Sequence, residues 1–466
     1  MMGDPMSEKR EIMHFLKSVV FLRRALKRFS ILMAGILLFN VASILRAQEA
    51  GNDDAFVPQT WNLHFQTTLL PQYHGSFPAA YNGKLSLNPG PELASSFTAT
   101  GFLGVKAWDG GFVFYDPEIP AGTGLSGVSG IADFSNGEIS KVGSANPTYN
   151  TARLYGQQVF GLGGEKEKID DDQNQLRVSE DISRLTLIAG KFSLPDFFDN
   201  NAYAHDARNQ FINLALVDNL AWDYAADTHG YTLGVYAELN QKDWAIRFAE
   251  ALMSTVANGP DYDWNISQAH ADNLEVEWRY GGDNGGGKIR LLGYINHANM
   301  GNYQNSLNLS PVDPDITQTR TYTQKYGLAL GWEQTVNTDF GLFARLGWND
   351  GTTESFELTA VDQTASLGGV LKGAGWDRAD DQLGLGLVIS GLSSVHQAYL
   401  AAGGYDFIIG DGALSYAPEQ LFELYYLYKP VKSVGLTLDF QGIENPAYNQ
   451  ARGPVGIVSG RAHFEI

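Results

Sequence analysis

Residues 273–298 read "NLEVEWRYGGDNGGGKIRLLGYINHA". In the first half, Val276 and Trp278 alternate with Glu275 and Glu277, and a similar alternation resumes in "KIRLLGYI" after a run of glycines. A period of two is typical of a β-strand with one apolar and one polar face. Two such strands around a glycine-rich turn predict a hairpin. Its apolar face must be shielded from water, while its other face carries charges of both signs.

Similar alternating segments recur along the rest of the chain. They lie at 95–108, 184–192, 231–239, 244–253, 325–336, 341–351, 382–392, 423–430, 435–443 and 456–466. Most are about 8–11 residues long, which suits a tilted strand that crosses a bilayer, whereas soluble strands average about five or six residues. At this spacing the chain could hold roughly 14–18 strands.

The connections between these segments alternate in length. Short turns are expected at 240–243, 337–340 and 430–434, and long loops at 109–181, 193–229, 299–323 and 352–381. Short turns on one rim and long loops on the other are typical of transmembrane β-barrels. A bilayer offers no water to unpaired backbone groups, so a β-structure that spans it must close. We therefore predict an all-β fold, a transmembrane antiparallel barrel with short periplasmic turns and long loops that are extracellular or folded inward.

Aromatic residues near the segment ends suit the interfacial girdles of such a barrel. They are Tyr231, Trp244, Trp278, Tyr280, Trp332, Trp348, Tyr425, Tyr426 and Tyr428. The alternative is a soluble β-sandwich or β-helix in which these rings form the core. A sandwich rarely has such long strands, and no short sequence repeat supports a β-helix.

Composition and the N-terminus indicate an exported protein. Charged residues make up 18% of the chain, below the roughly 25% of a typical soluble protein, and the formal charge of −20 disfavours nucleic-acid binding. The chain has no cysteine, which excludes disulfides and thiolate sites. A basic stretch, the apolar run "FSILMAGILLFNVASIL" and "RAQEA" predict a signal peptide at 1–47, with Met6 or Met13 as possible starts, and a mature barrel at 48–466.

The polar face of the strands would line a lumen. Its charged members include Glu275, Glu277, Arg279, Arg290, Arg345, Asp439, Arg461 and Glu465. Buried charges of both signs need water or each other, so we expect a water-filled pore rather than a packed core. On this interpretation Val276→Arg on the lipid face is costly, whereas Glu277→Gln one residue away costs little.

Several segments resemble the carbohydrate-selective porin family, the OprB type of Gram-negative outer membranes. The matching pieces include "NGEISKVG" (136–143), "AGKFSLPDFFDNNAYAHDARNQFIN" (189–213), "WDYAADTHGYTLGVYAEL" (222–239), "FARLGWNDGTTESF" (343–356), "GWDRADDQLGLGL" (375–387) and "HQAYLAAGGYDFIIGDG" (396–412). The resemblance implies a barrel of about sixteen strands in the outer membrane that lets small sugars diffuse passively. It also implies assembly through the C-terminal strand by the barrel assembly machinery. The family usually ends in an aromatic residue, whereas this chain ends in Ile466. A monomer and a homotrimer both remain open.

A pore for sugars needs aromatic faces and hydroxyl partners. Three clusters combine an aromatic residue with carboxylates and arginine, and we consider them candidates for the constriction. They are Arg208, Trp222, Asp223 and Asp227; Arg345, Trp348, Asp350 and Glu354; and Trp376, Asp377 and Arg378. Replacing Arg345 or Arg378 with alanine should change sugar block or ion selectivity while leaving folding intact. The alternative for each residue is a structural role, in which Asp holds a turn and Arg–Asp pairs fix a loop.

Other functions were weighed against the porin. A glycosidase needs two placed carboxylates, which "WDYAAD" and "GWDRADD" could supply, but nothing separates these from turn residues. A non-conducting structural barrel is the third possibility. We expect no enzyme activity, no cofactor and no metal. The acidic run 165–172 lacks the spacing of a calcium loop, and His205, His229, His270, His297 and His396 show no paired ligand spacing.

Overall fold

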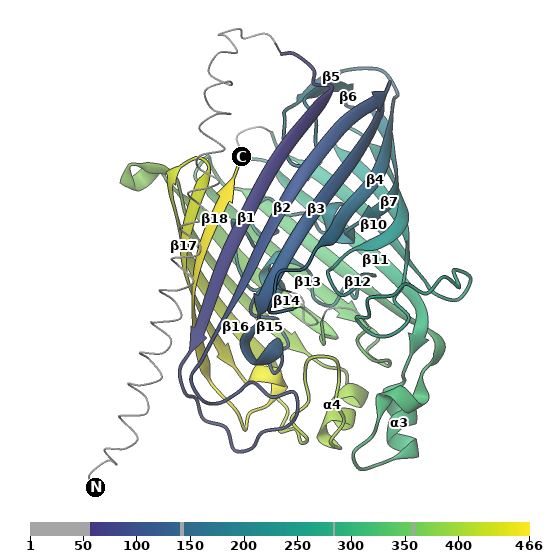
Figure 1. The fold of residues 1–466 in the computed structure, drawn as a ribbon, viewed down its shortest axis with the longest axis vertical. Coiled ribbons are helices and arrows are strands. Elements are labelled where there is room, and N and C mark those ends of the chain that lie inside the picture. Colours follow the sequence, from purple (N-terminus) through teal and green to yellow (C-terminus); the bar gives the residue numbers. More distant parts are fainter. Residues whose placement is uncertain (1–55, 140–143, 283–284, 357–358) are drawn as a thin grey trace. The chain divides into compact units, whose positions relative to one another are not determined.

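The computed structural model describes residues 56–139, 144–282, 285–356 and 359–466. The unit Pro58–Ile466 is a closed antiparallel barrel of sixteen strands, with β1 paired to β18 (Figure 1). The strands are β1 (Trp61–His74), β2 (Glu92–Trp108), β3 (Gly111–Thr123), β4 (Asn150–Gly161), β7 (Arg184–Phe192), β8 (Thr232–Asn240), β9 (Trp244–Leu252), β10 (His270–Tyr280), β11 (Gly287–Met300), β12 (Thr321–Thr335), β13 (Phe340–Asn349), β14 (Gln363–Gly373), β15 (Arg378–Gly391), β16 (Glu419–Val431), β17 (Val434–Glu444) and β18 (Val455–Glu465). This confirms the predicted fold class. The predicted signal peptide at 1–47 lies outside the described residues.

Short elements occupy the connections. A separate two-stranded hairpin, β5 (Lys166–Ile169) and β6 (Val178–Asp181), lies between β4 and β7. The helices are α2 (Leu214–Val217), α3 (Tyr303–Leu309) and α4 (Ser394–Ala401), with 3-10 turns η1 (Leu125–Gly127), η2 (Leu194–Asp196), η3 (Ile316–Thr319), η4 (Ala374–Trp376) and η5 (Pro446–Tyr448). Within the described ranges, every helix is too short or too polar to span a bilayer.

The predicted hairpin at 273–298 is present as β10 and β11. Val276 pairs with Leu291, and Glu277 pairs with Arg290. The alternation divides the residues as expected: Val276 and Leu291 are exposed on the outer face, whereas Glu277 and Arg290 are buried on the inner face. The apolar face that the sequence left unassigned is therefore the outside of the barrel, where it meets lipid hydrocarbon.

Two of the predicted long loops are wrong. The segment 109–181 contains β3, β4 and the β5–β6 hairpin, and 352–381 contains β14. In β3, Pro117 and Pro120 interrupt the alternation, and the register shifts between Asp116 and Pro117. Proline removes a backbone donor and glycine removes a side chain, so both weaken the sequence signal of a strand without preventing its formation between two neighbours.

Most of the aromatic residues predicted for the girdle face outward, but two do not. Trp244, Trp278 and Trp348 are exposed on the outer face. Tyr425 and Tyr231 instead lie inside the barrel and are buried. Tyr425 shares the inward face of β16, where its ring meets Phe211 edge to face at 4.9 Å. Tyr425 is two residues from Glu423, so the alternation along β16 places it on the inward face and leaves Tyr426 on the outer one.

A buried histidine, His396, links residues of three long connections through hydrogen bonds and ring stacking. The His396 ring of α4 lies with Nδ1 3.0 Å from Asp362 and Nε2 3.0 Å from Asp406. Its face stacks on Tyr303 of α3 at 4.2 Å, and the Tyr303 hydroxyl donates to Asp406. Burial disfavours the charged ring, but the two carboxylates more than offset this and raise the pKa of His396 to about 9.

This histidine predicts a pH dependence of stability. The pKa of His396 is raised on folding, so its contribution is complete below pH ~6.5 and is lost as the pH rises through about 9. The contribution is on the order of 3 kcal/mol. Thermal unfolding of the wild type and His396→Gln should differ most near pH 6 and converge by pH ~10. A difference in melting temperature that stays constant over this range would contradict the prediction.

Candidate functional site

The loop between β7 and β8, residues 193–231, folds into the barrel, and the charged wall binds its backbone. Three inward-facing carboxylates accept its N–H groups. Glu275 accepts from Asp199 at 2.9 Å, Glu333 accepts from Ala202 at 3.0 Å, and Glu423 accepts from Ile212 and Asn213 at 2.6 and 3.0 Å. This irregular loop pairs only part of its own backbone groups, and side chains of the wall satisfy others.

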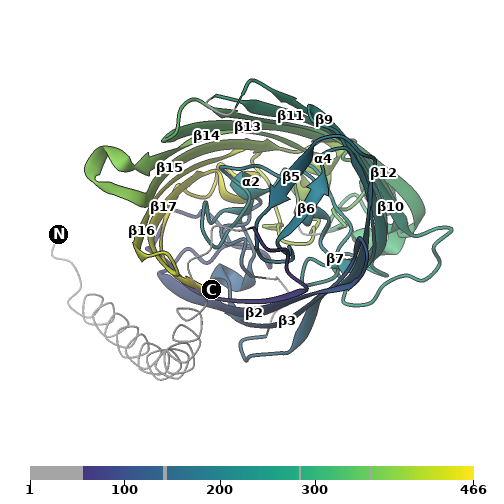
Figure 2. The same cartoon turned by 90° about the horizontal axis from the view of Figure 1, so that it is seen from above.

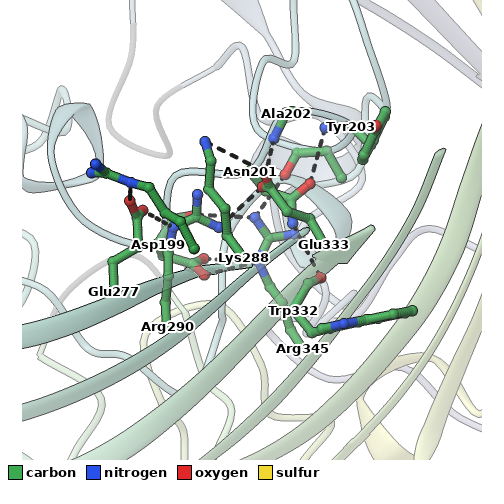
Figure 3. A network of polar contacts seen from close by, with 12 residues as sticks. Asp199, Asn201, Ala202, Tyr203, Glu277, Lys288, Arg290, Trp332, Glu333 and Arg345 are labelled. Carbon is green, nitrogen blue, oxygen red and sulfur yellow. Dashed lines mark hydrogen bonds and ion pairs between the residues drawn. The ribbon is translucent and has the colours of Figure 1, made fainter. Parts of the chain in front are cut away.

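Arginines of the wall bind the carbonyl groups of the same loop. Arg345 of β13 is 1% exposed and donates to the carbonyl oxygens of Leu216 and Ala204 at 2.8 and 2.7 Å, while its Nε lies 2.9 Å from Asp199 (Figure 3). Arg461 of β18 donates to the carbonyls of Ala207 and Gln210 at 2.6 and 2.8 Å. The planar guanidinium suits this task because its five donors point in fixed directions.

The wall charges also neutralise one another. Glu277 accepts hydrogen bonds from Arg279 at 2.7 Å, from Arg290 at 2.8 Å and from Arg247 at 3.2 Å. Arg290 also donates to Glu333 at 3.0 Å. These pairs alternate in sign around the inner face, which lowers the cost of taking each charge out of water.

The expectation that the interior is a pore and not a packed core is therefore only half right. On one side, the Phe211 and Leu216 side chains of the inward loop pack against Phe343 and Tyr425 of the wall. Charges that the sequence assigned to a water column, such as Arg345, are buried beneath this loop. The physical reason is that a wide barrel can satisfy its inner face with a folded-in segment as well as with water.

A cavity of about 1410 Å³ remains on the other side of the barrel. Its walls come from β1 to β4, β7 to β11 and β18, from the inward loop, and from the β5–β6 hairpin. Four of the charged residues predicted to face a lumen line it: Glu277, Arg279, Arg290 and Glu465. Figure 2 looks along the barrel and shows β5, β6 and α2 inside the ring of strands. The hairpin and the inward loop thus reduce a wide barrel to a narrower passage.

The cavity is lined by a group that we call the polar ring: Glu118, Glu138, Arg153, Asp196, Arg208 and Tyr231. Arg208 donates from Nε to Glu138 at 2.7 Å and from Nη2 to Glu118 at 3.3 Å. The Glu118 carboxylate also accepts from the Tyr231 hydroxyl at 3.2 Å. Burial opposes the charge on Arg208, but Glu138 and Glu118 more than offset this and raise its pKa.

The second arginine of the polar ring is held by the start of the inward loop. Arg153 of β4 donates from Nε to Asp196 of η2 at 2.7 Å and lies 3.3 Å from Asp116 of β3. Its guanidinium stands over the Tyr231 ring at 5.3 Å. Two cations, an aromatic ring and several carboxylates therefore share one stretch of the cavity wall, with donors and acceptors side by side.

The β5–β6 hairpin reaches into the same cavity from the rim of short turns. Asn174 donates to Asp116 at 2.9 Å, and Gln173 donates to Gln66 at 3.1 Å. Asn62 of β1 donates to Asp171 at 2.7 Å. Because these contacts cross from the β4–β7 connection to β1 and β3, the hairpin partly covers the mouth of the passage at this rim.

The structure places only some of the sequence-predicted constriction residues near the cavity. Arg208 lines it directly. Asp227 lies behind it, 3.0 Å from Lys191 and accepting from the Tyr262 hydroxyl. Trp222 is buried and donates to Asn273, and Asp223 forms a buried ion pair with Lys325. Arg345 binds the inward loop, as described above.

The remaining candidates lie elsewhere on the barrel. Trp348 is exposed on the outer face. Asp350 accepts from Thr352, and Glu354 pairs with Arg320, both within the long loops. Trp376 ends η4, Asp377 caps it, and Arg378 begins β15, where it pairs with Asp381 at 3.0 Å. These six residues do not line the described cavity.

The sequence did not indicate Glu118, Glu138, Arg153 or Asp196 as site residues, and it predicted Tyr231 as part of the aromatic girdle. Two of the family-like segments, "NGEISKVG" and "AGKFSLPDFFDNNAYAHDARNQFIN", contain Glu138 and Asp196 beside Arg208, and this proximity is the signal that could have found them. Glu118 and Arg153 fall within 109–181, which the sequence pattern predicts as a loop, so it does not indicate their positions on strands.

Comparisons with known proteins agree with this fold. The family model described as the carbohydrate-selective porin, OprB family, matches residues 105–466. The high-pH structure of Pseudomonas putida OprB is similar with a TM-score of 0.66 at 15% identity, covering 87% of this chain and 94% of that one. The outer membrane channel DcaP of Acinetobacter baumannii gives a TM-score of 0.50 at 11% identity, covering 90% and 100%. No curated protein matches the sequence.

Proposed function

This chain belongs to the OprB family of carbohydrate-selective porins, and from that premise we propose that sugars are selected at the polar ring. The protein is an outer-membrane porin for carbohydrates, as its family and its barrel show. The observation that supports the polar ring as the selecting site is its place on the wall of the cavity between the inward loop and the β5–β6 hairpin.

The chemistry of the polar ring suits sugars. A sugar presents hydroxyl groups, which both donate and accept hydrogen bonds, and C–H faces that lie well on aromatic rings. Arg153 and Arg208 supply donors, Glu118 and Glu138 supply acceptors, and Tyr231 supplies a ring. Because these charged groups already pair with one another, a sugar exchanges hydrogen bonds with them instead of meeting a bare charge. Weak exchange of this kind permits release as well as entry.

We propose that the protein acts without catalysis. The carboxylates of "WDYAAD" are engaged in structure, since Asp223 pairs with Lys325 and Asp227 pairs with Lys191. A glycosidase needs one carboxylic acid and one carboxylate placed on either side of a sugar bond.

We also propose that the barrel assembly machinery recognises the C-terminal strand β18, which closes the barrel against β1.

Replacing Arg208 with glutamine should weaken sugar binding in the pore. The change removes charge-assisted donors and leaves Glu118 and Glu138 without a counter-ion, so the half-blocking sugar concentration should rise about tenfold and cation selectivity should increase. The measurement is ion current through single channels in planar bilayers, with a panel of mono- and oligosaccharides and a salt gradient.

The matched control is Arg378→Gln, which alters an exposed turn that does not line the cavity. It should leave sugar block unchanged. Equal sugar block in the wild type and Arg208→Gln would remove the polar ring from the selecting site. Sugar hydrolysis by a barrel that conducts no ions would support an enzyme. A barrel that neither conducts ions nor hydrolyses sugars would support a structural role.

A further inference from the structure

Three metal-ligating side chains meet on the outer face of the barrel. His270, at the start of β10, lies directly opposite His297, near the end of β11. Their rings stack with centroids 4.4 Å apart, and Asp272 lies two residues along the same face of β10. One ligand atom of each residue lies within 4.8 Å of the others. The histidines are far apart in sequence, so only strand pairing brings them together.

A hydrogen bond orients one of these imidazoles for coordination. Nδ1 of His270 lies 2.7 Å from the carbonyl oxygen of Ile266. A carbonyl can only accept, so Nδ1 carries the proton and the neutral ring keeps its free lone pair on Nε2. That Nε2 lies 3.7 Å from the Asp272 carboxylate. Protein-bound metals are usually held by histidines whose other nitrogen is fixed in this way.

Two neighbouring carboxylates on this face would be stabilised by a bound cation. Asp272 pairs in register with Glu250 of β9, and both side chains point outward. Across the part of the chain that the structure describes, neither carboxylate has a lysine or arginine partner. Like charges directly opposite on neighbouring strands repel each other. Below them lies the exposed apolar band of Leu274 and Ile295, so the carboxylates sit where lipid limits their hydration.

We propose that His270, Asp272 and His297 bind one divalent transition-metal ion, with Zn²⁺ the preferred probe, on the outer face near the rim of long loops. Two imidazoles and a carboxylate match the donors that zinc and copper(II) prefer, whereas calcium and magnesium favour oxygen ligands alone. Three protein ligands leave one position of a tetrahedron to water, which Glu250 can orient. The site clamps β10 to β11 and is separate from the sugar passage inside the barrel.

The test uses the full, untagged barrel in detergent. Zn²⁺ affinity is measured by competition with a chromogenic chelator, and the Cu²⁺ form is examined by electron paramagnetic resonance. We expect one site per chain with two coordinated nitrogens. His270→Gln, His297→Gln and Asp272→Asn should each weaken Zn²⁺ binding by at least about tenfold, while Glu250→Gln should have a smaller effect.

His64→Gln is the matched control, because His64 lies 3.1 Å from Asp171 but is not part of the cluster. It should leave the Zn²⁺ affinity unchanged, and single-channel conductance should show that every variant is folded. Unchanged affinity in folded His297→Gln, or binding by the wild type through fewer than two nitrogens, would overturn the proposal. If His297→Gln fails to fold, the proposal is tested by the Zn²⁺ affinity of Asp272→Asn and by the number of nitrogen ligands in the wild-type copper spectrum.

Discussion

Alanine in place of Arg345 is expected to destabilise the barrel by about 3–5 kcal/mol and to enlarge its pore. The guanidinium is 1% exposed and is the counter-ion of Asp199, so its removal leaves that carboxylate buried and uncompensated. It also leaves the carbonyl groups of Leu216 and Ala204 without their donor. These contacts correct the expectation from the sequence that Arg345→Ala leaves folding intact. The inward loop should then detach from the wall, and single-channel conductance should rise and become noisier.

Denaturant unfolding in lipid vesicles and single-channel recordings measure the two effects. Arg345→Lys is an informative partner, since it keeps the charge but loses the forked donation and should recover only part of the stability. Arg378→Ala is the control, because Arg378 pairs with Asp381 away from the inward loop and the cavity, so its loss should leave the single-channel conductance unchanged. Wild-type stability and conductance in Arg345→Ala would mean that the inward loop is held by other contacts.

Val276→Arg and Glu277→Gln are expected to cost similar amounts of folding free energy, for opposite reasons. Val276 faces lipid near the middle of β10, where arginine costs about 2–4 kcal/mol. Glu277 faces inward and accepts from Arg247, Arg279 and Arg290, so loss of its charge leaves buried cations under-compensated, at a cost of about 3 kcal/mol. The sequence pattern alone had suggested that Glu277→Gln costs little.

Two variants separate these causes. Val276→Leu keeps the lipid face apolar and should be nearly neutral. Glu277→Asp keeps the charge on a shorter side chain and should recover part of the stability lost in Glu277→Gln. Both are measured by denaturant unfolding in vesicles. A neutral Glu277→Gln would show that the remaining partners are sufficient, namely Glu238 and Glu275 for Arg247 and Glu333 for Arg290.

The candidate site could be predicted only in part. Arg208 was identified because it stands in a family-like segment with nearby carboxylates. Its partners Glu118 and Glu138 come from β3 and from the following loop, and Arg153 comes from β4, so their convergence depends on how strands close into a barrel. The same holds for His270 and His297, which meet through the register of β10 and β11.

The sequence by itself determined the barrel and its faces. Side chains alternate across a strand with a period of two, and that local rule separates Val276 from Glu277 without reference to any other part of the chain. Strand length and the mix of short and long connections then require closure in a bilayer.

Only the tertiary structure decided what the inward charges do. Glu275, Glu423 and Arg345 bind backbone N–H and carbonyl groups of residues 193–231. Backbone groups are the same in every residue, so the sequence carries no mark of which loop will present them or where. Whether a buried charge meets water, another charge or a folded-in loop is therefore settled by contacts between segments distant along the chain.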